Sequence, residues 1–202
     1  LDFKIIGETK DDAIGECFDK VARTLGLPYP GGLPIDQHAK LGKHTYKLPT
    51  PLQGKGYDFS YSGLKTSVIN LVNQERMKKH KININDLCRS FEDTAVDIVV
   101  EKTIKAAKAY KVKQVVLAGG VSANSYLRNE IIKKIRKLLN MPYHIFINTE
   151  EKEHKIVGEI TKINNLYISI FKAFASFNSN FNPLIMKCNS SSHVSSFSFK
   201  AS

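Results

Sequence analysis

A glycine-rich turn is the clearest candidate for a ligand site in this sequence of 202 residues. The segment VVLAGGVSANSYLRNE runs from apolar residues into Gly119 and Gly120, and then through Ser122 and Asn124 into a basic helical pattern. A strand that leads through glycines to a helix N-terminus offers backbone N–H groups and a positive dipole end to a phosphate. The pattern is neither GxGxxG nor a P-loop with its lysine, so the Rossmann fingerprint and the Walker A motif do not apply. Taken alone, such a turn is more often a tight connection than a ligand site.

Three more residues could contribute to binding. Asp19 lies in a helical pattern and could accept hydrogen bonds from sugar hydroxyls, although a solvated helix carboxylate explains it equally well. Gly32 closes the turn PYPGG, and Asp36 would ordinarily be a surface acid or a helix cap. Each of the three has an explanation that needs no ligand.

Hydrophobic periodicity predicts the elements that would position these residues. Strands are expected at 3–9, 114–120 and 143–148, and helices at 11–27, 62–74, 83–111 and 125–139. The apolar stripes of the first and third helices are formed by Ile14, Cys17, Phe18, Val21 and Leu25, and by Leu87, Phe91, Ala95, Ile98 and Val99. Asp11 and Asp12 are expected to cap the first helix, and Asn83 or Asn85 the long one. The order of helices and buried strands indicates an α/β domain.

Composition limits the class of protein. With 42% hydrophobic and 24% charged residues, the chain resembles an ordinary globular protein. Thirty Lys and Arg against 19 Asp and Glu give a net charge of +11, which favours a polyanionic partner such as nucleic acid or an acidic membrane. A basic protein from a lysine-rich proteome explains the charge nearly as well. Three cysteines without CxxC spacing indicate neither a disulfide framework nor a zinc site. Without a signal peptide or a transmembrane run, a cytoplasmic location and no membrane partner are expected.

The C-terminal segment differs in composition from residues 1–148. Between Ile160 and Ser202 there is no Asp or Glu, whereas ten Ser and six of the eleven Phe occur there. The apolar residues follow neither the helical nor the strand period. We therefore expect 149–202 to be a divergent tail, disordered or foreign to the preceding domain, for example through a shifted reading frame.

Three segments resemble one known family when they are taken together. They are GETKDDAIGECFDKVARTLGLPYPGG, DFSYSGLKTSV and LAGGVSANSYLR, in this order and with fitting spacing. They are similar to the family motifs GE(S/T)xDDAxGEAFDK, LDFSFSGLKT and AGGVxAN of the TsaD family. These are tRNA threonylcarbamoyladenosine-forming enzymes, formerly described as O-sialoglycoprotein endopeptidases (glycoproteases). The resemblance covers residues 1 to about 147, which correspond to most of the family's second lobe.

The resemblance implies a fold, a reaction and a set of partners. The family has the actin-like ATPase (ASKHA) fold, with two RNase H-like lobes around a nucleotide cleft, of which this chain would supply an incomplete second lobe. The implied activity is that of an acyltransferase in tRNA modification. A threonylcarbamoyl group passes from threonylcarbamoyl-adenylate to N6 of the adenosine 3′ of the anticodon. A divalent metal, iron or zinc, helps to hold the acyl-adenylate, and bacterial members work with TsaB-like and TsaE-like proteins.

The motifs also carry site residues over to this chain. Asp19 is implied to accept from the adenylate ribose, and Gly32 and Asp36 to line the same pocket. Asn124, with the backbone of Gly119 and Gly120, is implied to contact the adenylate. No catalytic residue is assigned. The resemblance therefore implies that the glycine turn holds a nucleotide.

Departures from the family concern the metal and the first lobe. The family's HxxxH pair has no counterpart here, because no two of the six His are four residues apart. This sequence also lacks the family's SGGHT loop and its TDNxAMI segment. We therefore expect the metal ligands to be absent from this chain, and the chain to be inactive by itself. The alternative is a non-catalytic nucleotide- or RNA-binding remnant, or a truncated gene product. A sugar kinase is disfavoured by YSGLKT, and a metallopeptidase by the lack of HExxH.

Overall fold

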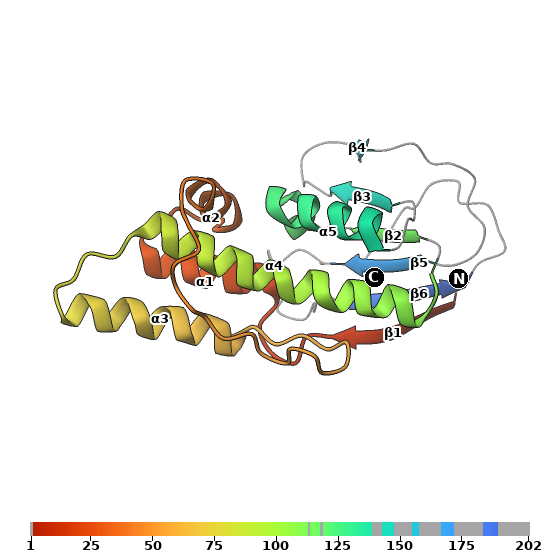
Figure 1. The fold of residues 1–202 in the computed structure, drawn as a ribbon, viewed down its shortest axis with the longest axis horizontal. Coiled ribbons are helices and arrows are strands. Elements are labelled where there is room, and N and C mark those ends of the chain that lie inside the picture. Colours follow the sequence, from red (N-terminus) through yellow and green to blue (C-terminus); the bar gives the residue numbers. More distant parts are fainter. Residues whose placement is uncertain are drawn as a thin grey trace, which may run out of the picture.

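The fold combines one mixed sheet with a layer of helices (Figure 1). The computed structural model describes residues 2–112, 114–117, 119–138, 143–147, 155–157, 167–171 and 184–189. The elements in chain order are β1 (Asp2–Glu8), α1 (Ile14–Leu25), α2 (Gly32–Ala39), α3 (Ser62–Met77), α4 (Ile84–Ala109), β2 (Gln114–Leu117), the 3₁₀ helix η1 (Gly120–Ala123), α5 (Ser125–Leu138), β3 (Tyr143–Ile147), β4 (Lys155–Val157), β5 (Tyr167–Phe171) and β6 (Leu184–Asn189). This arrangement confirms the expected α/β class.

The sheet has the strand order β1-β6-β5-β2-β3-β4. Strand β2 pairs in parallel with both β3 and β5, and the other pairings are antiparallel. The strands β4, β5 and β6 belong to the segment 149–202 that was expected to be a divergent tail. Most of that segment lies outside the described residues, and the division of the chain at residue 148 stays a prediction.

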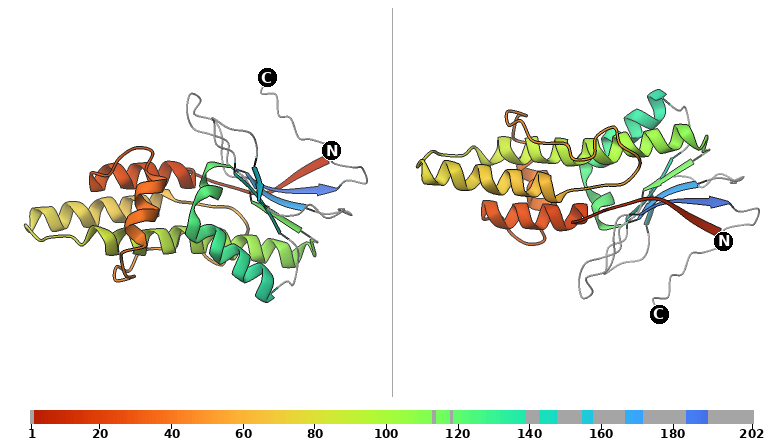
Figure 2. Two further views of the ribbon diagram at one scale, coloured as in Figure 1. Left: turned by 90° about the horizontal axis from the view of Figure 1, so that it is seen from above. Right: turned by 90° about the horizontal axis from the view of Figure 1, so that it is seen from below.

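The helices α1, α3 and α4 lie alongside one another, and α4 continues past them to the sheet (Figures 1 and 2). Helix α4 has 26 residues, which corresponds to a length of about 39 Å. All ten apolar residues expected to form the stripes of α1 and α4 are buried. The rings of Phe18 and Phe91 meet edge to face with centroids 4.9 Å apart, so the two stripes share one core. In the part of the chain that the structure describes, no helix has the length and apolarity needed to cross a membrane.

The beginning of α3 is stabilised by an acid from the segment just before α1. Asp11 accepts hydrogen bonds from the backbone N–H groups of Tyr61 and Ser62, at 2.7 and 3.3 Å, and from the hydroxyls of Ser60 and Ser62. Helix α1 begins after Ala13 without a side-chain cap. The expectation that Asp11 and Asp12 cap α1 was therefore wrong, because the carboxylate of Asp11 serves a helix 50 residues further along the chain.

The other expected cap is confirmed. Asn83 accepts a hydrogen bond from the backbone N–H of Asp86 at the start of α4, at 3.2 Å. Asn85, the alternative cap, instead lies 2.6 Å from Nδ1 of His38 on α2. The side chain of Asn85 therefore joins α2 to the start of α4.

The loop between α2 and α3 is attached to α4 by polar side chains. Ser90 Oγ accepts hydrogen bonds from the backbone N–H groups of Thr45 and Tyr46, at 3.1 and 3.0 Å. Lys102 is 1% exposed and donates from Nζ to the carbonyls of Leu52 and Lys55, at 2.8 and 2.7 Å. These bonds satisfy a buried ammonium group that would otherwise be costly to desolvate.

Candidate functional site

The glycine turn leads into α5 through a short 3₁₀ helix. Gly119 has φ +93°, a backbone conformation that side-chain-bearing residues rarely adopt. The N–H of Ser122 donates to the carbonyl of Gly119 at 2.9 Å, and that of Asn124 donates to Val121 at 3.0 Å. These two N–H groups, expected to be free for a phosphate, are therefore already bonded inside the turn.

Asn124 is fixed at both ends of its side-chain amide. Its Oδ1 accepts from the backbone N–H of Leu127 at 2.8 Å, and thereby caps α5. Its Nδ2 donates to Oε1 of Glu92 on α4 at 2.6 Å. The residue expected to contact an adenylate thus also connects the start of α5 with the N-terminal half of α4.

Asp36 connects α2 with the same region. It is 5% exposed, and its carboxylate accepts from Lys40 Nζ and from the hydroxyl of Ser125, both at 2.7 Å. Ser125 directly follows Asn124, so the structure brings these two predicted site residues together although 88 positions separate them in the sequence. A buried and bonded Asp36 differs from the surface acid that its sequence context alone would predict.

Asp19 and Gly32 meet at the turn before α2. Asp19 Oδ1 accepts from the backbone N–H of Gly31 at 2.7 Å, which holds the turn against α1. A Cβ on Gly31 would lie 2.5 Å from Cβ of Ala22, whereas a Cβ on Gly32 would have no atom within 4 Å. Gly31 is therefore required for packing, while Gly32 faces open space. Helix α1 also contacts η1, so the same helix contacts both the turn before α2 and the segment that follows the glycine turn.

Glu92, like Ser125, contacts the predicted site residues although no sequence motif indicated it. It is 1% exposed, and burial raises its pKa to about 7. The hydrogen bond from Asn124 and the charge of Arg89 lower this pKa, while the neighbouring carboxylates of Asp36 and Asp93 raise it. The sequence signal that could have indicated its burial is its place directly after Phe91 in a helix rich in apolar residues, most of which the structure buries.

Next to Glu92, a second group of charges joins the same elements. Asp93 pairs with Arg89 at 2.8 Å, and with Nδ1 of His44 at 2.9 Å. The guanidinium of Arg89 lies over the ring of Tyr126, 4.3 Å from its centroid. The start of α5 is thus attached to α4 through both Asn124 and Tyr126.

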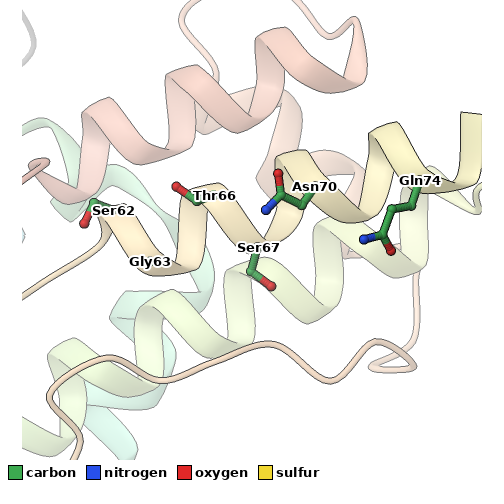
Figure 3. Close-up of a pocket in the computed structure, with 6 residues that line it drawn as sticks. All are labelled: Ser62, Gly63, Thr66, Ser67, Asn70 and Gln74. Atoms are coloured by element: carbon green, nitrogen blue, oxygen red, sulfur yellow. The ribbon is translucent and has the colours of Figure 1, made fainter.

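A groove along α3 lies apart from this cluster (Figure 3). It is lined by small and polar residues on successive turns of the helix: Ser62, Gly63, Thr66, Ser67, Asn70 and Gln74. None of the predicted site residues lines it. Because one helix supplies all the lining residues, the groove offers no converging groups and carries no functional assignment.

The described residues do not fit a metal ion. Among them there is no group of three or more His, Cys, Asp or Glu side chains that could hold one.

The fold and this cluster define an α/β protein in which two buried acids, Asp36 and Glu92, bond the residues between a glycine turn and the helix that follows it. The model of the family described as TsaD, tRNA N6-adenosine threonylcarbamoyltransferase, matches residues 1–153. The chain belongs to this family.

Curated relatives carry the same description. Proteins named tRNA N6-adenosine threonylcarbamoyltransferase from Listeria welshimeri and Mycoplasma capricolum subsp. capricolum are each 53% identical, over 136 and 133 residues. These alignments cover 67% and 65% of this chain, and 40% and 42% of the relatives. A relative from Staphylococcus haemolyticus is 50% identical over 129 residues, 63% of this chain and 38% of its own length. The chain thus spans about two fifths of the length of the relatives it matches.

Proposed function

We propose that this chain is part of a tRNA N6-adenosine threonylcarbamoyltransferase. The proposed reaction moves a threonylcarbamoyl group from threonylcarbamoyl-adenylate to N6 of the adenosine 3′ of the anticodon. The observation that carries the proposal is the match of residues 1–153 to the family, at 50–53% identity to relatives of that name. Because the matched relatives are much longer than the aligned segment, the activity is proposed for the intact protein.

The reaction is an acyl transfer, and this chain would contribute to positioning. The N6 amine attacks the carbamate carbonyl, a C–N bond forms, the C–O bond to the phosphate breaks, and AMP leaves with the bonding pair. A proton is lost from the amine. Holding the adenylate still relative to the RNA amine accounts for much of such a rate enhancement.

The residues have separate roles in this proposal. Asp19 uses one carboxylate oxygen for Gly31 and would accept the ribose hydroxyl at the other. Gly32 supports this role, because a Cβ there would point into open space. Asp36 and Asn124 would line the adenylate pocket with the backbone of Gly119 and Gly120, which agrees with the bonds that join α2 and α4 to the start of α5.

The wider assembly is part of the same proposal. The chain would form an incomplete lobe of an actin-like ATPase fold, with the other wall of the cleft supplied by a second lobe. A divalent iron or zinc ion would be held by residues of the intact protein. TsaB-like and TsaE-like proteins are the proposed protein partners, in addition to tRNA. Because tRNA is modified in the cytoplasm, we propose the same location for this activity.

The test replaces the matching segment of the Listeria welshimeri relative with residues 1–138 of this chain. The chimera is incubated with tRNA and preformed threonylcarbamoyl-adenylate, and the nucleosides are then analysed. We expect modified adenosine from the chimera, and none above the no-protein control from the 202-residue chain alone. A folded chimera that binds AMP and tRNA without modifying it would contradict the proposal and favour a non-catalytic binding remnant.

A substitution in the chimera tests the site. Asn124→Ala removes polar contacts in a partly buried pocket. It is expected to lower kcat/KM by the factor that corresponds to a loss of about 1–3 kcal/mol in transition-state stabilisation. Lys108→Ala, on an exposed position of α4, is the control and should change little. Equal effects of the two substitutions would contradict the assignment of Asn124.

A further inference from the structure

We propose that Glu92 is a positioning residue for the adenylate site: it holds the amide of Asn124 in one orientation, so that one N–H of that amide faces the ligand. This inference rests on the proposed function and adds to it a residue that the family resemblance does not assign. Glu92 acts through Asn124 and needs no contact with the ligand.

The geometry of the amide carries the argument. Asn124 Oδ1 accepts from the N–H of Leu127 at 2.8 Å, while Nδ2 donates to Glu92 Oε1 at 2.6 Å. Rotating the amide by 180° would place Nδ2 against an N–H donor, and Oδ1 against a carboxylate oxygen. While Glu92 is ionised, both contacts would be repulsive, so the two partners together select one orientation. The amide nitrogen has a second hydrogen, and we assign this donor to the adenylate.

Burial makes this selection strict. Glu92 is 1% exposed, so water cannot take over as the acceptor for Nδ2 if the carboxyl is removed. Its location in the N-terminal half of α4 keeps the acceptor in place, because the helix is packed against α2 and α5. Asn124 is thus held by the backbone of α5, through Leu127, and by the side chain of Glu92 on α4.

The electrostatic surroundings supply a second signature. The groups that act on Glu92 are Asp36 from α2, Arg89 and Asp93 from α4, and the amide of Asn124, while Cys88 lies on the same helix. Burial raises the pKa of Glu92 to about 7, and the two aspartates add to this. The carboxyl should therefore change its protonation within a range in which the protein can be studied. The Nδ2 protons of Asn124 should report that change.

The first experiment follows the side-chain amide of Asn124 by ¹⁵N–¹H NMR in the 202-residue chain, with Asn124→Asp used for assignment. The expected result is a titration of this resonance with a midpoint near pH 7 that is absent in Glu92→Gln. Glu101→Gln removes a carboxylate from the same helix and should leave the titration unchanged. A resonance whose chemical shift is the same in the wild-type chain and in Glu92→Gln at every pH would overturn the Glu92–Asn124 contact, whatever the function of the protein.

The second experiment measures AMP binding by the chain and its variants. Glu92→Leu removes the acceptor and should weaken AMP binding about tenfold, whereas Glu92→Gln keeps an acceptor oxygen and should stay within about threefold of the wild type. If Glu92→Leu does not fold, the comparison uses Glu92→Ser, which is too short to reach Nδ2. Wild-type affinity in the folded variant that lacks the acceptor would overturn the positioning role.

The two experiments separate this inference from the proposed function. If neither the wild-type chain nor the chimera with the Listeria welshimeri relative binds AMP, the adenylate site fails and the positioning role fails with it, although the NMR titration can still support the contact. If AMP binds and Glu92→Leu or Glu92→Ser binds it equally well, only the positioning role fails.

Discussion

Replacing Asp11 tests whether the helical layer depends on a cap supplied from a distant part of the chain. In Asp11→Ala, the N–H groups of Tyr61 and Ser62 lose an acceptor, and so do the hydroxyls of Ser60 and Ser62. Loss of an N-cap acceptor costs about 0.5–2 kcal/mol, and loss of a negative charge at a helix N-terminus about 0.3–1 kcal/mol. Because the Asp11 side chain is only partly buried, we expect a loss of about 2 kcal/mol in the free energy of unfolding.

The pH dependence of this effect has a defined sign. Burial by itself would raise the pKa of Asp11, but the hydrogen bonds from Ser60, Ser62 and the backbone of Tyr61 together hold it below its ordinary value. A lowered pKa in the folded state means that the stabilisation is present above the unfolded pKa of about 3.9. It is lost as the pH falls through the folded value. The difference between wild type and Asp11→Ala should therefore shrink below about pH 4.

Urea unfolding followed by circular dichroism, at pH 7 and in steps down to pH 3, measures both quantities. Glu16→Ala is the matched control, because it removes an exposed acid whose ion pair with Lys20 is expected to contribute at most about 0.5 kcal/mol. Asp11→Asn should fall between wild type and Asp11→Ala, since the amide keeps one acceptor oxygen. Equal losses for Asp11→Ala and Glu16→Ala at pH 7 would refute the assignment of Asp11 as the cap of α3.

Further predictions concern the two glycines and the net charge. Gly31→Ala should lower the free energy of unfolding by about 1–3 kcal/mol, because the new Cβ would lie 2.5 Å from Cβ of Ala22 and 2.7 Å from the carbonyl oxygen of Phe18. Gly32→Ala should unfold like the wild type and yet bind AMP more weakly; the reverse order of stabilities in urea would contradict the packing described here. The affinity for tRNA should fall with salt, and the slope of log affinity against log salt concentration should be roughly −0.9 for each phosphate neutralised. Replacing the basic residues of the segment 78–81 (Lys78, Lys79 and Lys81) with neutral ones should make that slope less steep in a filter-binding assay. Affinity that is independent of salt would exclude an electrostatic origin.

The sequence predicted most of the helical layer, because a buried stripe leaves a periodic signal. The apolar positions of α1 and α4 follow the helical period, and the structure buries all of them. Helix α2 was not predicted, since its eight residues include Gly32 and Pro34 and give little periodic pattern. The role of Asp11 was predicted wrongly because capping rules use neighbours in the sequence, whereas its partners at Tyr61 and Ser62 become neighbours only after folding.

The candidate site was predicted unevenly for a related reason. Asp36 and Asn124 were named from motifs, but neither motif contains the information that Ser125 would join them. Glu92 had no motif, and its signal was an acid at a position that tertiary packing later buries. Contacts between distant segments determine which side chains are buried, and burial determines which acids have a raised pKa. These properties could therefore be known only from the structure.

Helix α4 has a consequence for how parts of the molecule can open. Through Ser90 and Lys102 it holds the loop before α3, and through Glu92 it holds the start of α5. Releasing the loop exposes a buried ammonium group, and releasing α5 leaves a buried carboxyl without its amide partner. Both segments therefore belong to the same cooperative unit as the core helix, although loops and helix ends usually open by local fluctuations of low free energy. In this protein, backbone amides near the glycine turn would become accessible to hydrogen exchange mainly when α4 itself is disturbed.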